Sequence, residues 1–393
     1  MIPVAEALAR VLALADAPAT EVVPLRAAAG RVLAAPVIAL RDQPPFAASA
    51  MDGYAIREDD HVTGRSLRVI GEAGAGHAFA GSPGPGEAVR IFTGAPVPAG
   101  AERVVLQEDV TRSGETVVLG ERLETQTNIR ALGQDFRAGD RIEAPRLLRP
   151  VDLALIAAMN VAEVTVARAP EVAILATGDE LVMPGEDPRP DQIVASNSFA
   201  LAAMAEAAGA RVRMLPIARD SEASLRQSFA LAAGCDLIVT IGGASVGDHD
   251  LVGRVAVELG MERAFWKVAL RPGKPLMAGR IGAARMLGLP GNPVSAIVCG
   301  HLFLLPLLAA MQGLPGEVRS LTAELGCDLP ANGPRAHYMR ARLTGGAGLP
   351  RIAPVDSQDS ARLRLLAEAD ALLIRPAGDG ARRAGDRVDY IAL

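Results

Sequence analysis

The chain has 393 residues, enough for roughly two to four domains, and half of its residues are hydrophobic. A formal net charge of -5 and the lack of a long basic run argue against a general nucleic-acid-binding protein. Glycine or proline interrupts the longest apolar stretches before they reach the length of a membrane span, and the first 15 residues do not resemble a signal peptide, so we expect a cytoplasmic protein without membrane contact.

The cysteine and histidine patterns argue against disulfides and against a zinc centre. Cys235, Cys299 and Cys327 are isolated and form no CxxC pair, which favours a reduced, intracellular protein. The five histidines are scattered without HExxH or another zinc spacing. Transition-metal catalysis is therefore not expected.

The N-terminal segment is expected to begin with an amphipathic helix over residues 3–15, with Pro3 in its first turn. Short strands are expected at 22–23 and 31–33. Because this segment is too small to be a domain alone, we expect it to pack with a later segment or with a second subunit. A helix at 150–159 is expected to return and pack with the N-terminal helix.

Residues 41–139 consist of short alternating segments joined by glycine-rich turns, which predicts a β-rich domain with one strand at 54–56. Three polar residues stand out in its loops, namely Asp52 in MDGYAIR, Thr93 in IFTGAPVPAG and Asp135 in GQDF. An aspartate beside a glycine in a loop of small residues suits catalysis, and a threonine hydroxyl suits contact with a ligand. Each is also compatible with an ordinary turn, in which such side chains bond to the nearby backbone.

The central part of the chain alternates strand and helix patterns, which is typical of βαβ units and a parallel sheet. A mostly β-branched run at 237–241 predicts an interior strand covered on both faces. Gly242 and Gly243 end this strand, and Asp248 or Asp250 can cap the helix that follows. The unit would expose backbone N–H groups at the carboxyl edge of the sheet, where open α/β sheets bind ligands.

Other elements of this part follow the same alternation. Strands are expected at 172–176 and 212–217, and helices at 196–209, 222–233 and 294–311. Asp220 stands just ahead of the helix at 222–233 and is its candidate N-cap.

Both acidic loops follow strands and should therefore meet at the edge of this sheet, and we expect the RPGKP segment to lie near them. Two acidic loops would repel a phosphate unless a cation stood between them. Carboxylates for a divalent cation beside fixed positive charge suit attack on a phosphoanhydride, although solvated loop charges are the alternative. The acidic members are Asp179, Glu180, Asp248 and Asp250, and the basic members are Arg271 and Lys274.

The last part of the chain changes to short strand-like runs, which predicts a small β-barrel or sandwich over residues 316–393. Arg340 and the segment 357–360 are its polar candidates for a site. A surface arginine on a strand is the alternative interpretation of Arg340. The expected strands lie at 338–343, 371–375 and 387–391.

Six motifs occur in a fixed order along the chain: AMDGYAIR, IFTGAPVPAG, TGDEL, GGASVGDHD, AFWKVALRPGKP and LPGNPVSA. Together they resemble the molybdopterin molybdenumtransferase family, which includes MoeA of bacteria and the C-terminal E domain of gephyrin. The resemblance extends over the whole chain. It implies insertion of molybdate into adenylylated molybdopterin, with magnesium-dependent cleavage of the phosphoanhydride and release of AMP, as the last step of molybdenum cofactor biosynthesis.

The resemblance also implies a multidomain α/β plus β protein that forms a homodimer. The active site would join the α/β domain of one subunit to the β-rich domain of the other. The implied domains are an elongated dimerisation domain from 1–40 and 140–170, a β-rich domain at 41–139, a parallel α/β molybdopterin-binding domain at 171–315 and a C-terminal β-barrel at 316–393.

The family's functional residues map onto three sets of positions. The catalytic acids would be Asp52, Asp135, Glu180, Asp220 and Asp250, of which Asp135, Glu180 and Asp250 are candidate Mg2+ ligands. The residues that contact the pterin substrate would be Thr93, Asp179, Gly242, Gly243, Ser245, Asp248, Pro290 and Pro293. The residues that bind molybdate would be Arg271, Lys274, Pro275, Arg340 and Ser360.

Two positions depart from the family pattern. Arg271 replaces the first lysine of KPGKP, so a planar guanidinium replaces the compact ammonium group of lysine. Asp359 occupies a position at which a small or uncharged residue is common. Two alternatives stay open, a molybdopterin adenylyltransferase and a gephyrin-like scaffold. The extra domains argue against the first, and the lack of a fused domain or long disordered linker argues against the second. The expected protein partners are a molybdopterin adenylyltransferase and molybdoenzymes.

Overall fold

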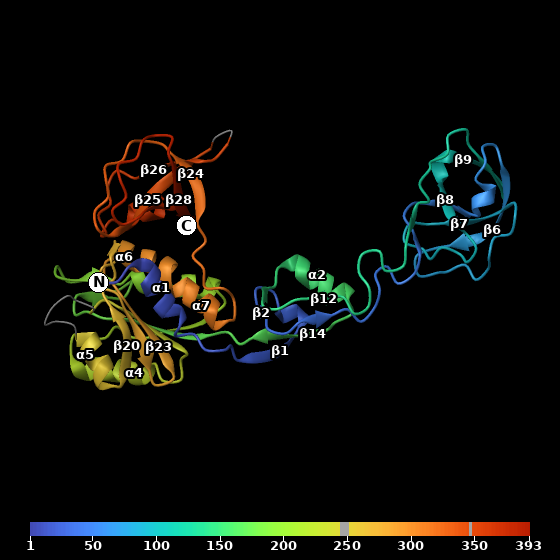
Figure 1. Ribbon diagram of the computed structural model, residues 1–393. Helices are drawn as coiled ribbons and strands as arrows, with labels where there is room; N and C mark the ends of the chain where they lie inside the picture. The colour runs from blue at the N-terminus through green and yellow to red at the C-terminus, as the bar shows by residue number, and fades with distance from the viewer. Residues whose placement is uncertain (244–250, 346–347) are drawn as a thin grey trace. The chain divides into compact units, whose positions relative to one another are not determined.

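The computed structural model describes residues 1–243, 251–345 and 348–393, which form two compact units (Figure 1). Unit 1 consists of Met1–Glu21, Gly30–Ala34 and Val166–Leu393, and unit 2 consists of Val22–Ala29 and Ala35–Thr165. The chain passes from one unit to the other along β1 (Thr20–Pro24) and β14 (Glu163–Ala167).

A six-stranded sheet forms the centre of unit 1, in the order β18-β15-β19-β23-β22-β20. The first four of these strands are parallel, as the sequence predicts, and the last two are added in antiparallel pairing. All five residues of β19 are buried, which confirms it as an interior strand. The bounds are β15 (Glu171–Ala176), β18 (Arg211–Met214), β19 (Leu237–Ile241), β20 (Met261–Trp266), β22 (Met277–Ile281) and β23 (Ala284–Leu289).

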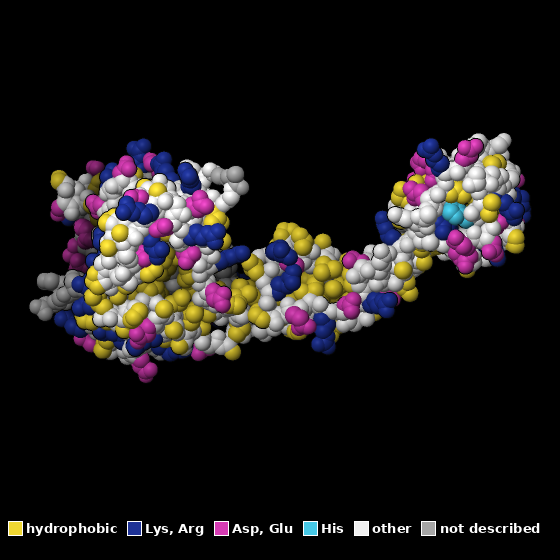
Figure 2. Space-filling view, turned by 45° about the horizontal axis from the view of Figure 1, so that its top comes forward, with side chains coloured by type: hydrophobic (Ala, Val, Ile, Leu, Met, Phe, Trp, Pro, Cys, Tyr) yellow, Lys and Arg dark blue, Asp and Glu magenta, His cyan; other side chains and the backbone are white. Residues whose placement is uncertain are grey.

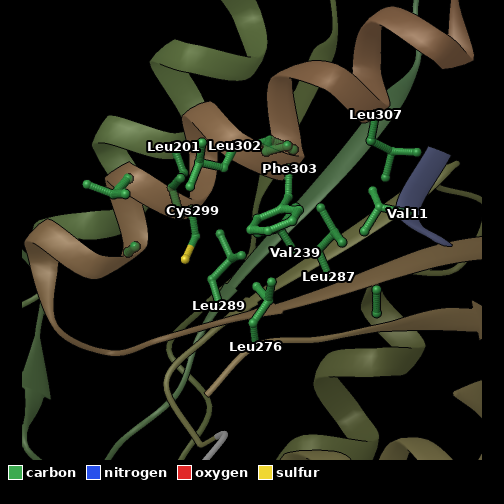
Figure 3. Packing of buried hydrophobic residues seen from close by; sticks show 14 of the residues in the cluster. Val11, Leu201, Val239, Leu276, Leu287, Leu289, Cys299, Leu302, Phe303 and Leu307 are labelled. Carbon is green, nitrogen blue, oxygen red and sulfur yellow. The ribbon is translucent and has the colours of Figure 1, made fainter. Parts of the chain in front are cut away.

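Helices cover both faces of this sheet, so neither face of its buried strands meets water (Figure 1). On one face, Figure 3 shows the ring of Phe303 directed toward Val239 and Leu287 of the sheet. This face is covered by α1 (Val4–Leu12), α3 (Asn197–Ala207), α6 (Pro293–Cys299), the π-helical turn η4 (Gly300–Leu304) and α7 (Leu305–Met311), and the other by α4 (Glu222–Leu231) and α5 (Leu251–Glu258).

The N-terminal helix packs in unit 1, whereas the helix at 150–159, with which it was expected to pack, belongs to unit 2. Ala7 and Val11 on α1 are buried in the same core as Leu307 of α7 (Figure 3). The apolar face of α1 is therefore packed against the α/β core. The segment that follows α1 packs beside the helix at 150–159 in unit 2, and the Leu25 N–H donates to the carbonyl of Ala162, just after this helix, at 2.8 Å.

The last long helix continues through Gly300 and Pro306, in agreement with the helix expected at 294–311, so the expectation that glycine or proline interrupts every apolar stretch short of a membrane span is wrong here. Proline lacks an N–H and its ring clashes with the preceding turn, and the wider π turn just before Pro306 accommodates it. The resulting stretch Pro293–Met311 is long and apolar enough to cross a membrane, yet 72% of its apolar window is buried inside the protein. It is a core helix of unit 1 (Figure 3).

The C-terminal strands form a closed five-stranded β-barrel, which confirms the first of the two architectures expected there. Pairing of β25 with β27 closes the barrel. The short strand β21 (Leu270–Arg271) pairs in parallel with the start of β25 and so joins the RPGKP segment to the barrel. The bounds are β24 (Leu321–Leu325), β25 (Ala336–Thr344), β26 (Arg351–Pro354), α8 (Leu363–Ala367), β27 (Ala371–Arg375) and β28 (Arg387–Ala392).

Unit 2 contains a six-stranded sheet in the order β8-β5-β7-β6-β10-β9, and the predicted β-rich character of this part is confirmed. Its residues alternate between two small cores, with Tyr54 and Ile56 in one and Ala55 in the other. The bounds are β5 (Gly53–Ile56), β6 (Ser66–Ala73), β7 (Glu87–Ile91), β8 (Arg103–Leu106), β9 (Val110–Ser113) and β10 (Thr116–Leu119).

Short elements complete both units. Unit 1 also has β2 (Val32–Leu33), β16 (Leu181–Val182) and β17 (Ile193–Val194). Unit 2 also has η1 (Leu25–Ala27), β3 (Val37–Ile38), β4 (Ala48–Ser49), η2 (Glu58–Asp60), η3 (Gln107–Asp109), β11 (Ile129–Arg130), β12 (Arg141–Ile142), β13 (Arg146–Leu147) and α2 (Pro150–Ala158).

Candidate functional site

A pocket of about 1270 Å³ opens in unit 1 at the carboxyl ends of its parallel strands. Ala176, Ile241 and Leu289 end three neighbouring strands in one register, so the loops that follow them leave the sheet side by side. The barrel supplies a further wall. The lining includes Thr177, Gly178, Glu180, Asp220, Gly242, Gly243, Arg271, Lys274, Pro275, Pro290, Asn292, Pro293, Arg335, His337, Gln358, Asp359 and Ser360.

Glycine is needed where two of these loops leave the sheet. Gly242 has a φ of 86° and an added Cβ would lie 2.9 Å from the Thr177 carbonyl oxygen. Gly178 has a φ of 147°, and an added Cβ would lie 2.4 Å from Oε2 of Glu180. The Glu180 carboxylate thus folds over Gly178, and a side chain at that position would displace it.

Glu180 and Asp220 place two carboxylates in the pocket. Neither carboxylate has a hydrogen-bond or ion-pair partner among the described residues. The prediction that Asp220 caps the helix at 222–233 is wrong, because the Ser221 hydroxyl accepts the hydrogen bond from the Ser224 N–H at 3.3 Å. Ser221 takes the capping role, and the Asp220 side chain is left for the pocket.

Asp179, the neighbour of Glu180, does not line the pocket. Its Oδ1 accepts a hydrogen bond from the Asp220 N–H at 3.2 Å, and its carbonyl accepts one from the Arg219 guanidinium at 3.1 Å. Asp179 therefore fixes the loop that carries Asp220, which is an indirect role. Three further predicted site residues, Ser245, Asp248 and Asp250, lie outside the described residues.

The opposite side of the pocket is basic. Arg271, Lys274 and Arg335 line it, and none of the three joins an ion pair within the described parts of the chain. His337 lies among them and is buried. Burial, together with the charges of Arg271 and Arg335 and more distant arginines, lowers the pKa of His337 to about 4. The histidine is therefore neutral at physiological pH, and the positive charge comes from the arginines and the lysine.

Ser360 joins the barrel to the α/β part of unit 1. Its hydroxyl accepts a hydrogen bond of 2.9 Å from the Asn292 amide, and its carbonyl accepts one of 3.1 Å from the Val294 N–H. Asn292 precedes α6, so the loop of the barrel rests on the first turn of this helix. Pro290 and Pro293 line the pocket on either side of Asn292.

Arg340, predicted to bind molybdate directly, is not among the pocket-lining residues. It is 1% exposed, and its guanidinium donates to the carbonyls of Arg362 at 2.9 Å, Ser357 at 2.9 Å and Asp359 at 3.0 Å. These contacts fix the loop that carries Ser360. The geometry favours a positioning role for Arg340 and does not support the alternative of a surface arginine.

Asp52, Thr93 and Asp135 belong to unit 2 and do not line this pocket. Asp52 accepts hydrogen bonds from the Thr93 N–H and hydroxyl, which lower the pKa of its carboxyl with help from the charge of Arg90. Arg90 lies over the rings of Tyr54 and Phe92 at 5.1 and 4.8 Å.

Asp135 is an exposed residue of unit 2. Its N–H donates to the Gln43 carbonyl at 2.9 Å, and its carboxylate has no partner among the described residues. The structure thus brings Asp52 and Thr93 together, whereas Asp135 makes no hydrogen bond to either residue in the described parts of the chain.

No group of three or more His, Cys, Asp or Glu side chains suited to a metal ion occurs among the described residues. Mg2+ does not need such a cage, because it usually takes one or two carboxylates together with substrate phosphates and water. Glu180 and Asp220, two unpaired carboxylates in one pocket, fit that mode of binding.

Sequence reasoning missed several residues around these sites. Arg335 and His337 were not singled out, although their spacing of two at the start of β25 places them on one face. Asn292 lies inside the LPGNP motif but was not assigned a role. No sequence pattern indicated a role for Arg90, because its contacts depend on the pairing of β5 with β7.

Three family descriptions match successive parts of the chain. Residues 2–160 match the MoeA N-terminal region (domain I and II), residues 173–310 match a probable molybdopterin binding domain, and residues 322–393 match the MoeA C-terminal region (domain IV).

Similar proteins cover almost the full chain. The molybdopterin molybdenumtransferase of a Nostoc species is 35% identical over 373 residues, which span 92% of this chain and 86% of that protein. The molybdopterin molybdenumtransferase 2 of Mycobacterium tuberculosis is 36% identical over 370 residues, 90% of each chain. The crystal structure of the molybdopterin biosynthesis moeA protein from Pyrococcus horikoshii OT3 superposes with a TM-score of 0.84 at 28% identity and covers 100% of both chains.

Proposed function

The chain belongs to the molybdopterin molybdenumtransferase (MoeA) family, and on this premise we propose that it inserts molybdate into adenylylated molybdopterin and releases AMP. It is a transferase of the late part of molybdenum cofactor biosynthesis. The observation that carries the finer proposal is that one pocket holds both carboxylates and cations that have no ion-pair partner among the described residues, Glu180 and Asp220 on one hand and Arg271, Lys274 and Arg335 on the other.

The phosphoanhydride of the substrate would lie at the glycine turns that follow β15 and β19. Backbone N–H groups at the carboxyl edge of a parallel sheet suit phosphate oxygens, and the close approach of Gly242 to Thr177 leaves no room for a side chain there. Pro290 and Pro293 border the same space and give it an apolar wall for the pterin. Ser245 and Asp248 are proposed to contact the same substrate.

Glu180 and Asp220 would hold Mg2+ against the phosphoanhydride, with Asp250 and Asp135 as further proposed ligands. When bound, the ion would neutralise phosphate charge and make the bond to AMP easier to break. Glu180 is well suited to this task because its carboxylate lies over Gly178 in the pocket and has no partner among the described residues. Asp179 would support the site by holding the Asp220 loop.

Molybdate would bind on the basic side of the pocket. Lys274 and Arg271 supply positive charge to a tetrahedral dianion, and Pro275 shapes the wall beside them. Ser360 offers a hydroxyl from the barrel, and Arg340 fixes the loop on which Ser360 stands. The oxyanion would thus be held opposite the metal-bound phosphoanhydride.

Asp52 would be supplied to this pocket by the second subunit of a homodimer. Unit 2 bears exposed apolar side chains along α2 and the segments beside it, among them Leu40 at 64% exposure and Val151 at 63% (Figure 2). An exposed apolar face of this kind supports burial against another copy of the chain. A cytoplasmic location and exchange with a molybdopterin adenylyltransferase and with molybdoenzymes stay predictions.

The proposal is tested by measuring AMP release from adenylylated molybdopterin with and without molybdate and Mg2+. We expect release to require all three components. Adenylylation of molybdopterin by ATP without molybdate would instead identify an adenylyltransferase. Full activity in variants that lack the pocket carboxylates would exclude the proposed site.

The shared site is tested by mixing two inactive variants, Asp52→Ala and Glu180→Ala. If each site combines Glu180 of one subunit with Asp52 of the other, random mixed dimers contain one intact site, and activity returns to about one quarter of the wild-type rate. If each site is built within one subunit, mixed dimers contain no intact site and activity stays absent. Sedimentation of the mixture checks that dimers form.

A further inference from the structure

We propose that Arg219 is a positioning residue that ties the loop of Glu180 to the loop of Asp220 and so sets the two carboxylates for a divalent cation. The inference rests on the proposed function, in which these carboxylates hold Mg2+. It assigns a role to a residue that does not line the pocket and that stands outside all six motifs.

The guanidinium of Arg219 holds the backbone on both sides of Glu180. Its Nη1 donates to the Asp179 carbonyl at 3.1 Å and to the Leu181 carbonyl at 3.2 Å. The carbonyl of Glu180 itself accepts a hydrogen bond of 2.7 Å from the Ile193 N–H. All three carbonyls at 179–181 therefore have donors, and one side chain serves the two that flank the carboxylate residue.

The backbone of Arg219 is anchored beside the second carboxylate, because Asp220 follows it directly in the chain. The Arg219 N–H donates to Oγ of Ser224 in the first turn of α4 at 2.9 Å. The Asp220 N–H donates to Oδ1 of Asp179 at 3.2 Å, which adds a second link between the loops. A shift of either loop away from the other would therefore break hydrogen bonds, and the two carboxylates keep their relative position.

The charge of Arg219 and its hydrogen bonds have opposite effects on a cation. A guanidinium repels a divalent ion, so removal of the charge alone would tighten cation binding. Removal of the hydrogen bonds would weaken binding, because the ion would then have to order both loops when it binds. Arg219 is exposed, and water and salt screen its charge. We therefore expect the positioning effect to dominate.

Titration of the full protein with Mn2+ in the presence of AMP tests the inference. Mn2+ takes the same oxygen ligands as Mg2+, and its EPR signal reports the free ion. Arg219→Ala should weaken Mn2+ binding about tenfold, because charged hydrogen bonds that order the site are lost. Arg219→Lys keeps the charge and N–H donors and should recover part of the loss. The matched control is Arg213→Ala, since the exposed Arg213 also donates to two carbonyls, those of Leu231 and Ala233, but lies outside the pocket. It should bind Mn2+ as the wild type does.

Unchanged or tighter Mn2+ binding by Arg219→Ala overturns the inference. Glu180→Ala in the same titration separates this failure from a failure of the proposed function. If Glu180→Ala weakens Mn2+ binding and Arg219→Ala does not, the metal site stands and only the positioning role is lost. If Glu180→Ala also binds Mn2+ as the wild type does, the proposed metal site and the inference both fail.

Amide hydrogen exchange of residues 178–182 provides a readout that needs neither metal nor turnover. These amides should exchange faster in Arg219→Ala than in the wild type, and Arg213→Ala should leave them unchanged. Saturating Mn2+ with AMP should reverse part of the increase, because an ion bound to both loops stabilises them. Equal exchange of this loop in wild type and Arg219→Ala would contradict the positioning role. Similar thermal midpoints of the Arg219 and Arg213 variants check that unit 1 stays folded.

Discussion

Thr93 donates two hydrogen bonds to the same carboxylate oxygen of Asp52, from its N–H at 2.7 Å and from its hydroxyl at 2.8 Å. The two residues are 41 positions apart and meet because β5 and β7 pair with Gly53 opposite Ile91. Both bonds favour the ionised carboxylate and lower its pKa. The loop that carries Thr93 thus keeps Asp52 charged and oriented.

Thr93→Val should raise the pKa of Asp52 toward that of an ordinary aspartate. The substitution removes the hydroxyl donor and keeps the backbone donor, so part of the effect should remain. NMR titration of the Asp52 carboxyl group measures the change directly. Thr111→Val, on the exposed strand β9, is a control that should leave the titration unchanged. A lower pKa in Thr93→Val would contradict the assigned role of the hydroxyl.

Glu180→Ala should abolish AMP release while the protein stays folded. The substitution removes charge from the pocket and no packing from a core, since Glu180 is exposed and lies over Gly178. AMP release and the thermal midpoint should be measured together. Glu206→Ala, which removes an exposed carboxylate of α3 outside the pocket, should retain full activity. Normal turnover of Glu180→Ala would remove Glu180 from the catalytic residues.

Local patterns in the sequence predicted some features well. The run 237–241 gave an interior strand with the observed bounds, because β-branched residues without polar alternation suit a strand covered on both faces. The loops after β15 and β19 were correctly expected to begin at one edge of the sheet, since strand register places Ala176 beside Ile241. These inferences needed only local composition and the known geometry of parallel sheets.

Features that depend on distant contacts were not predictable in the same way. Ser221 and Asp220 are both good capping residues, and only the structure shows that Ser221 caps α4. Asp52 and Thr93 were each singled out, but their hydrogen bonds require the pairing of β5 with β7. The burial of Arg340 requires the loop 357–362 to fold back onto β25.

Lys274→Ala should raise the molybdate concentration needed for half-maximal AMP release. Lys274 lines the pocket and has no ion-pair partner among the described residues, so its loss should weaken binding of a dianion about tenfold if one charged hydrogen bond is removed. The rate at saturating molybdate should change less. A titration of initial rates with molybdate separates the two effects. An unchanged half-saturating concentration of molybdate would show that Lys274 does not bind the oxyanion.

Asp152→Ala should destabilise the protein by roughly 2–4 kcal/mol, because two arginines and a helix start depend on this carboxylate. Asp152 is 1% exposed and accepts hydrogen bonds from the Arg149 N–H at 2.9 Å and from the Arg146 guanidinium at 2.6 Å. Chemical denaturation measures the loss. Asp59→Ala, which removes a carboxylate that is 87% exposed in a surface ion pair, should cost little.

The contribution of Asp152 should also depend on pH in a defined direction. Hydrogen bonds, first of all from the Arg149 side chain, hold the pKa of Asp152 well below its ordinary value of 3.8. A carboxyl group whose pKa is lowered by folding stabilises the fold above its unfolded pKa and loses this effect as the pH falls toward the folded pKa. The difference in stability between wild type and Asp152→Ala should therefore be full at neutral pH and shrink below about pH 4. A difference that grows on acidification would refute this explanation.

Arg340→Lys should distinguish a positioning role from direct binding of molybdate. Lysine keeps the positive charge but cannot reproduce the fork that reaches the carbonyls of Arg362, Ser357 and Asp359. If Arg340 acts through the loop, the variant should lower the thermal midpoint, increase amide exchange of 357–362 and weaken the molybdate response. If Arg340 binds the anion through its charge alone, the molybdate response should be largely retained. Arg342→Lys, in an exposed ion pair on the same strand, is the matched control. Because the Arg340 guanidinium is buried and already donates three hydrogen bonds to backbone oxygens, we expect the first outcome.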